Sequence, residues 1–287
     1  MEMIRPRNTL ELLRAIHSIQ GEGYLVAGCT DFLAGRSGTW WDADCLIDLL
    51  GVKEMQGIHR TGDCLRIGAV CTHSEIGAHP LVRALCPALR QACLEVGSML
   101  IRNRGTIGGN LCTASPAGDI YPVLLASGAE ILCLNLAGNQ RKIPAGKFIT
   151  GKGATVLQPG EAVIRIEIPL PAAGSRSAFA KLGERKKVTI AKISLCMVSG
   201  VRNGCLKNPR IVLGAVSEAA FLSDYAGSVM DGAPLDATLA DQLWPILSDE
   251  IAASIPTRSS MPYKKEAVRG LTEDLIARFL SEASVCG

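Results

Sequence analysis

The chain has 287 residues, 48% of them hydrophobic and 20% charged, which excludes a mainly disordered protein and predicts a core of ordinary size. Thirty Lys and Arg residues against 27 Asp and Glu leave a net charge of +3, so charge gives no indication of nucleic-acid binding. The length predicts two domains, or two lobes followed by a smaller unit.

Residues 1–55 predict a small α/β lobe. Asn8 is followed three residues later by Glu11, an arrangement that resembles a capping box at the start of a helix. Apolar residues then recur at helical spacing until Gly21. Short buried strands are expected at 24–27 and 45–49.

Residues 56–173 predict a second lobe. A strand at 64–69 is followed by Thr72 and Glu75 at capping-box spacing, and the helix that they begin is expected to continue through Leu81, Leu85 and Leu89. Further strands are expected at 130–136 and 162–168. Pro171–Ser175 is the best candidate for a linker, so the first domain is expected to end at about residue 173.

Residues 174–287 predict a second domain with strands at 177–182, 193–202 and 209–217, followed by two helices. The last helix carries a single apolar stripe that is expected to pack on this sheet, formed by Ala267, Leu271, Leu275 and Phe279. Together these patterns favour the α+β class.

Two glycine-bearing segments could hold a ligand. The segment 25–32 follows a strand, where backbone N–H groups can converge on an anion. The stretch 105–118 is expected to be a long loop, and with Asp119 it combines adjacent glycines with hydroxyl, amide and carboxylate groups. Neither segment is a GxGxxG or Walker A sequence. The second suits a nucleotide, and the alternative is a polar surface loop held by local hydrogen bonds.

The cysteines and histidines give no sign of a reactive centre. Eleven cysteines are an odd number without a CxxC pair, and most lie between apolar residues, so we expect free core thiols and no metal site. None of the four histidines lies near a nucleophile signature, so we find little support for a catalytic role in any of them. They are His17, His59, His73 and His79.

The compartment follows from what the chain lacks. The start of the sequence has no secretory signal pattern, and its most apolar stretch, 121–137, is too interrupted for a membrane helix. We therefore expect a cytoplasmic protein without membrane contact.

The segment RNRGTIGGN at 102–110, running on through Ser115 and Pro116 to Asp119, resembles the FAD-binding (medium) subunit of molybdenum hydroxylases. That family includes xanthine dehydrogenases and aerobic carbon monoxide dehydrogenases. The resemblance extends over almost the whole chain, including 27–31, 179–186 and 190–191. Cys29 departs from it, because most relatives have a second glycine there.

The resemblance implies a two-lobe FAD-binding domain of the PCMH type over 1–173 and a smaller C-terminal α/β-sandwich domain over 174–287. FAD is the implied cofactor. Its pyrophosphate would be cradled by Val26, Ala27, Gly28, Cys29, Thr30, Asp31 and Phe32. The other side of the site would comprise Thr106, Gly108, Gly109, Asn110, Thr113, Ser115 and Asp119, with Asp119 accepting hydrogen bonds from sugar or ribityl hydroxyls. Val163 would offer backbone contacts, Lys181 would reach the flavin, and Val96 and Ile101 would lie beside the rings.

The implied function is electron transfer within a hetero-oligomer. A molybdopterin-binding large subunit oxidises the substrate, a small subunit carries [2Fe–2S] clusters, and FAD on this chain passes the electrons to NAD⁺ or another acceptor. No catalytic side chain is then required. Two alternatives stay open at this point: a self-contained FAD-dependent oxidoreductase of related fold, and a non-enzymatic chain that has lost FAD.

Overall fold

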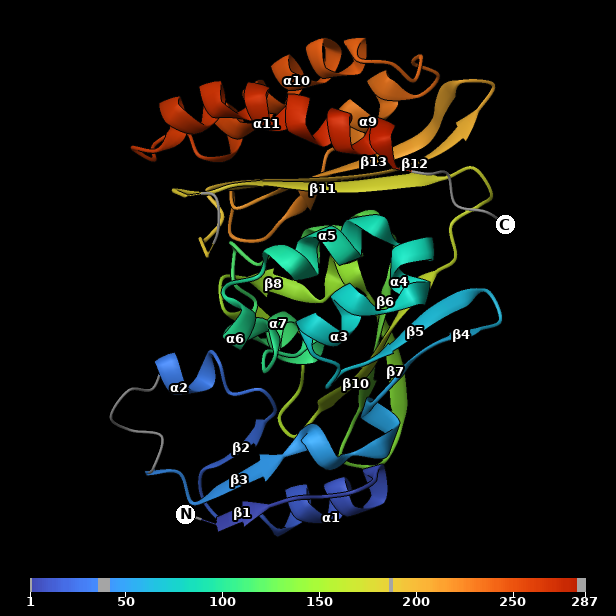
Figure 1. Cartoon of the computed structure of the whole chain (residues 1–287). Coiled ribbons are helices and arrows are strands. Elements are labelled where there is room, and N and C mark those ends of the chain that lie inside the picture. The colour runs from blue at the N-terminus through green and yellow to red at the C-terminus, as the bar shows by residue number, and fades with distance from the viewer. Residues whose placement is uncertain (1, 36–41, 186–187, 283–287) are drawn as a thin grey trace.

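The computed structural model describes residues 2–35, 42–185 and 188–282, and these form three sheets of three or more strands and a short two-stranded one. Mixed helix and sheet confirm the α+β class. Figure 1 shows the chain stacked from the N-terminal elements at the bottom to the C-terminal helices at the top. The expected boundary between two domains near residue 173 stays a prediction.

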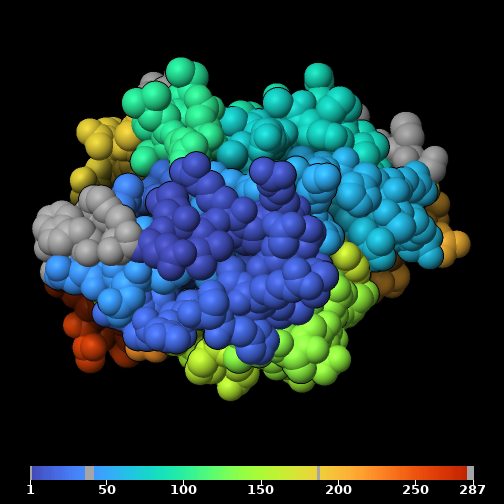
Figure 2. All heavy atoms as spheres, turned by 90° about the horizontal axis from the view of Figure 1, so that it is seen from below, coloured from blue at the N-terminus to red at the C-terminus, as the bar shows by residue number. Residues whose placement is uncertain are grey.

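The first sheet is parallel, with the order β1-β3-β2. Its elements are β1 (Glu2–Ile4), α1 (Thr9–Ser18), β2 (Gly23–Val26), α2 (Phe32–Gly35) and β3 (Cys45–Asp48). The predicted helix start is confirmed, because Asn8 Oδ1 accepts from the Glu11 N–H at 2.9 Å. The carboxyl end of β2 leads directly into the loop 27–31. In the space-filling view from below, this N-terminal segment covers the centre of the molecule (Figure 2).

The middle sheet is antiparallel, with the order β4-β5-β10-β6-β7. Its strands are β4 (Ile58–Thr61), β5 (Cys64–Gly68), β6 (Glu130–Leu134), β7 (Gln140–Pro144) and β10 (Ala162–Pro169), and the short pair is β8 (Ile149–Gly151) with β9 (Ala154–Thr155). The three predicted strands are confirmed. The edge strands β4 and β7 are mostly exposed, so no buried apolar run marked them.

The helices of this part correct two expectations. The expected continuous helix after Thr72 is three helices, because Pro80 and Pro87 lack an N–H and each begins a new one. The helices are α3 (His73–Ala78), α4 (Pro80–Leu85) and α5 (Pro87–Glu95). The expected loop 105–118 contains α7, because the Thr106 hydroxyl caps a helix start. The remaining helices are α6 (Met99–Arg102), α7 (Ile107–Thr113) and α8 (Ile120–Ala126).

The last sheet lies between two layers of helices, as Figure 1 shows. Its antiparallel strands are β11 (Arg176–Leu182), β12 (Ile193–Arg202), β13 (Cys205–Gly214) and β14 (Phe221–Leu222). One face packs on α5 and α8, and the other packs on α9 (Asp224–Met230) and α11 (Met261–Ser281). The helix α10 (Thr238–Ser254) packs against α11 and α9. Leu271, Leu275 and Phe279 are buried there, which confirms the predicted stripe.

The ten cysteines among the described residues are free, and six of them are buried: Cys45, Cys71, Cys86, Cys93, Cys133 and Cys196. They pack as small core side chains, as expected. No helix within the described ranges is long and apolar enough to cross a membrane.

Candidate cofactor-binding site

A cavity of 960 Å³ lies between the first sheet, the middle helices and the β11–β12 connection. Its volume is at the upper end of the range of about 300–1,000 Å³ that small-molecule and cofactor sites occupy. The structure brings most of the predicted residues to its wall: Val26, Ala27, Gly28, Cys29, Thr30, Asp31, Phe32, Val96, Ile101, Thr106, Gly109, Asn110, Thr113, Ser115 and Asp119.

The loop at the end of β2 forms one wall. A Cβ atom on Gly28 would lie 1.9 Å from the carbonyl oxygen of Arg104, so only glycine lets this loop approach the segment before α7 so closely. Cys29 has a φ of +60°, the left-handed conformation that glycine adopts most easily. The loop has the left-handed backbone with a cysteine in place.

The start of α7 forms the opposite wall. Thr106 is the N-cap, and its Oγ1 accepts from the Gly109 N–H at 3.2 Å. A Cβ on Gly109 would lie 2.9 Å from the same oxygen. The helix places Asn110 and Thr113 toward the cavity, and its C-cap Ala114 has a φ of +46°. Residues 115–118 then lead to Asp119.

Asp119 is the charged group at the base of this wall. It is 6% exposed, and its Oδ2 accepts from Lys181 Nζ at 2.6 Å, while its Oδ1 is buried without a hydrogen-bond partner. Burial raises the pKa of Asp119 to about 6, although the charge of Lys181 acts in the opposite direction. An unpaired buried carboxylate oxygen beside a cavity is suited to accept from a ligand hydroxyl.

Three predicted residues do not line the cavity. Gly108 faces the core, where a Cβ would lie 2.8 Å from both the Cβ and the carbonyl oxygen of Ala69. Val163 is buried in β10, which pairs with β6, so its backbone is used by the sheet. Lys181 is directed at Asp119 and at the carbonyl oxygen of Glu95, 2.8 Å from Nζ, and not into the cavity.

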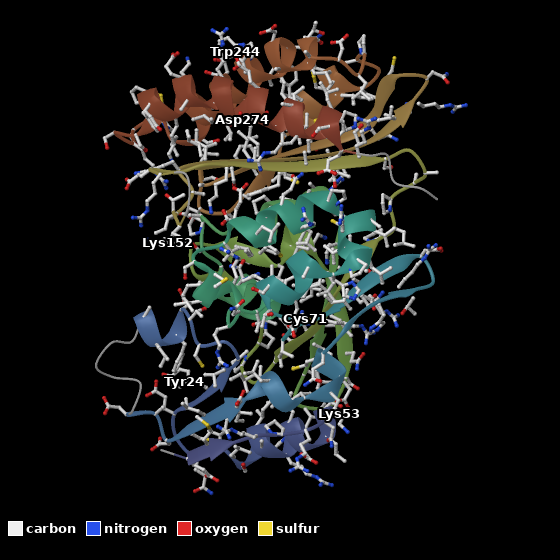
Figure 3. All side chains as sticks on the ribbon, in the orientation of Figure 1. Tyr24, Lys53, Cys71, Lys152, Trp244 and Asp274 are labelled. Carbon is white, nitrogen blue, oxygen red and sulfur yellow. The ribbon has the colours of Figure 1, made fainter. Side chains whose placement is uncertain are left out.

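Sequence reasoning missed two parts of the wall. One is His73, which is 2% exposed. It follows Cys71 by two residues, and Figure 3 labels Cys71 in the middle of the molecule. The other is the β11–β12 connection, which contributes Glu184, Arg185 and residues 188–192. The family resemblance covered this connection, but no pattern of apolar residues placed it beside loops far away in the sequence.

These features fit a large ligand with phosphate and hydroxyl groups. Close backbone approach at Gly28 leaves N–H groups near the cavity, Asp119 Oδ1 is an unused acceptor, and Val96 and Ile101 supply apolar surface for rings. FAD has each of these groups.

Comparison with known proteins identifies the family. The family described as the FAD binding domain in molybdopterin dehydrogenase matches residues 1–171. This chain belongs to that family. It is 31% identical to the nicotinate dehydrogenase FAD-subunit of Eubacterium barkeri over 90% of this chain and 88% of that one. It is 27% identical to the carbon monoxide dehydrogenase medium chain of Hydrogenophaga pseudoflava over 75% of this chain and 74% of that one.

Solved structures show the same fold. A chain of the cyanide-inactivated Cu,Mo-CO dehydrogenase superposes with a TM-score of 0.88 at 23% identity, covering 99% of this chain and 98% of that one. A chain of quinoline 2-oxidoreductase from Pseudomonas putida 86 superposes with a TM-score of 0.86 at 24% identity, covering 98% of this chain and 96% of that one. The predicted resemblance to molybdenum hydroxylase subunits is confirmed, and with it an oxidoreductase family whose cofactor is FAD.

Proposed function

We propose that this chain binds FAD in the 960 Å³ cavity and acts as the electron-transfer subunit of a molybdenum hydroxylase complex. The observation that carries the proposal is that the two segments singled out in the sequence, 26–32 and 106–119, lie on opposite walls of one cavity. They are more than seventy residues apart in the chain, and only the fold brings them together.

The residues of the cavity have distinct parts in holding the cofactor. Backbone N–H groups of the loop 27–31 and the Thr30 hydroxyl bind the pyrophosphate. Asn110 and Thr113 donate from α7, and Asp119 accepts from sugar or ribityl hydroxyls through the oxygen that Lys181 leaves unpaired. Val96 and Ile101 exclude water from the rings.

Held in this cavity, FAD would supply the electron-transfer chemistry. The chain itself needs to bind, orient and shield the cofactor, and no described side chain has to move a proton. A self-contained oxidoreductase is not favoured, since the relatives carry names such as FAD-subunit and medium chain.

The partners in this proposal are a molybdopterin-binding large subunit and a small subunit with [2Fe–2S] clusters. The relatives named as an FAD-subunit and as a medium chain support an assembly of several chains. The proposed acceptor is NAD⁺ or another electron acceptor. The β11–β12 connection forms one rim of the cavity.

The test is to purify the chain after FAD supplementation and to measure flavin released by mild acid. One FAD per chain is expected, and a chain without flavin would contradict the proposal. Co-purification from the native source should bring molybdenum and iron with the chain. Anaerobic addition of NAD⁺ to the substrate-reduced complex should restore the absorbance of oxidised flavin. A flavin that stays reduced would exclude NAD⁺ as the acceptor.

A further inference from the structure

His73 is a cavity residue whose position does not depend on its own ring. It is the first residue of α3, and Thr72 before it forms a capping box with Glu75. The backbone N–H of His73 donates to the carbonyl oxygen of Gly105 at 3.0 Å. The start of α3 is therefore attached to the segment before α7, and the imidazole is held at the junction of these elements.

The imidazole lies where the two cavity walls meet. A Cβ atom on Gly105 would be 3.2 Å from His73 Cδ2 and 3.3 Å from Thr30 Oγ1. Because glycine has no side chain there, the histidine ring and the threonine hydroxyl flank the same point. The neighbouring loop approaches closely at Gly28 as well. His73 thus lies beside the loop proposed to bind the pyrophosphate.

The ring lacks the partner that a structural histidine normally has. His73 is 2% exposed, and its Nδ1 has no hydrogen-bond partner among the described residues. Buried polar side-chain atoms are usually paired, and an unpaired one calls for an explanation. Burial, helped by the nearby charge of Arg102, lowers the pKa of His73 to about 4, so the ring is neutral at pH 7. A neutral imidazole has one N–H to donate.

We propose that His73 is a further cofactor contact, which donates its Nε2–H to a pyrophosphate oxygen of the bound dinucleotide beside Thr30 and Gly105. Nε2 is the ring nitrogen bonded to Cδ2, the atom that lies next to Gly105, and the buried Nδ1 is then the unprotonated nitrogen of the neutral ring. The proposal rests on the proposed binding of FAD in this cavity. An acceptor is the appropriate ligand atom, because the Thr30 hydroxyl and the backbone N–H groups of the loop are also donors. The competing explanation is a ring that only fills space.

The test compares FAD dissociation constants, from flavin fluorescence, of the wild type and His73→Phe. Phenylalanine keeps the ring shape without its N–H. Loss of one hydrogen bond to a charged group should weaken FAD binding by about 10- to 150-fold. His59→Phe is the matched control, since His59 is exposed on β4, and it should leave the constant unchanged. Unchanged affinity in His73→Phe would overturn the proposal.

Two further measurements fix the contact. ADP, which shares the pyrophosphate, should lose affinity for His73→Phe by the same factor as FAD, and an unaffected ADP affinity would overturn the assignment to phosphate. The ring nitrogen shifts of ¹⁵N-labelled His73 in the wild type should change when FAD is added, and unchanged shifts would overturn the contact even where the variant does not fold. Failure of the wild type to bind FAD would contradict the proposed function instead.

Discussion

Lys181 on β11 donates to Asp119 Oδ2 over 2.6 Å, across 62 positions of the sequence, and also to the carbonyl oxygen of Glu95 at the end of α5. The two side chains are 4% and 8% exposed. One buried ammonium group thus joins the C-terminal sheet to the end of α5, at Glu95, and to the start of α8, at Asp119, which lines the cavity. The resemblance implies that Lys181 reaches the flavin, which stays a prediction, and in the structure its ammonium group is paired with Asp119.

Replacing Lys181 by Met should destabilise the chain strongly. Asp119 would stay buried without its ion-pair partner, and breaking a buried pair from one side costs about 3–5 kcal/mol. Urea unfolding of the FAD-free chain measures the change. Lys265→Met is the matched control, because Lys265 and Asp249 form an exposed pair at 3.8 Å. Equal unfolding midpoints for both variants would show that the buried pair contributes little.

Replacing Asp119 by Ala should weaken FAD binding by about 10- to 150-fold, because a hydrogen bond to a charged acceptor is lost. Fluorescence titration with FAD measures the effect. Asp231→Ala is a suitable control, since that carboxylate lies on the surface and pairs with Lys207 outside the cavity. If the two variants bind FAD equally well, Asp119 is not part of the site.

Replacing Gly28 by Ala should disrupt the junction of the two cavity walls. Its Cβ would meet backbone atoms of Arg104 at 1.9 and 2.7 Å, which a side-chain rotation cannot relieve. A loss of about 1–3 kcal/mol in unfolding free energy is expected, together with a loss of FAD affinity. Gly35→Ala meets no atom within 4 Å and should change neither quantity. An unaffected Gly28→Ala variant would mean that the loop can move away freely.

Cys29 predicts an unusual order of variants. A positive φ destabilises a folded chain with a non-glycine residue by roughly 1–2 kcal/mol. Replacing that residue by glycine removes this cost, but the greater freedom of glycine in the unfolded chain lowers the stability by about 0.5–1 kcal/mol. Cys29→Gly should therefore be as stable as the wild type or slightly more stable, with FAD affinity retained. Cys29→Val should be less stable, because β-branching crowds the left-handed backbone. Thermal unfolding of the two variants gives the order, and a Val variant as stable as the Gly variant would refute this explanation.

His73 and Asp119 predict opposite dependences of stability on pH. The pKa of His73 is lowered to about 4 from its ordinary value of 6.5, so the unfolded chain takes up the proton first as pH falls. The neutral His73 ring therefore contributes about 3 kcal/mol to the free energy of unfolding above pH 6.5, and this contribution is lost as pH falls from 6.5 to 4. The pKa of Asp119 is raised to about 6 from 3.8, so the folded chain takes up that proton first and gains stability as pH falls from 6 to 4.

The two contributions offset each other in the wild type, and variants separate them. Urea unfolding at pH 7.5 and pH 4 should show the stability of His73→Phe rising relative to the wild type at the lower pH. Asp119→Asn should fall relative to the wild type over the same interval. Parallel pH profiles for all three proteins would mean that neither group titrates in this range.

Much of the architecture could be predicted because its determinants are local. The Asn8 cap, the apolar stripe ending at Phe279 and the strands at 130–136 and 162–168 each depend on neighbours within a few residues or on one buried face. The helix breaks at Pro80 and Pro87 also have a local cause, the missing N–H of proline. The helical spacing of Leu81, Leu85 and Leu89 nevertheless favours one continuous helix in the sequence. The capping role of Thr106 turned an expected loop into α7.

The residues of the chain were enough to identify the family, the cofactor class and the two segments that line the cavity. Only the folded chain shows that Lys181 pairs with Asp119, that Gly108 and Val163 face the core, and that the Nδ1 of His73 is unpaired beside the cavity. The physical reason is that motifs record local backbone geometry, whereas the burial and pairing of a side chain depend on elements that only the folded chain brings together.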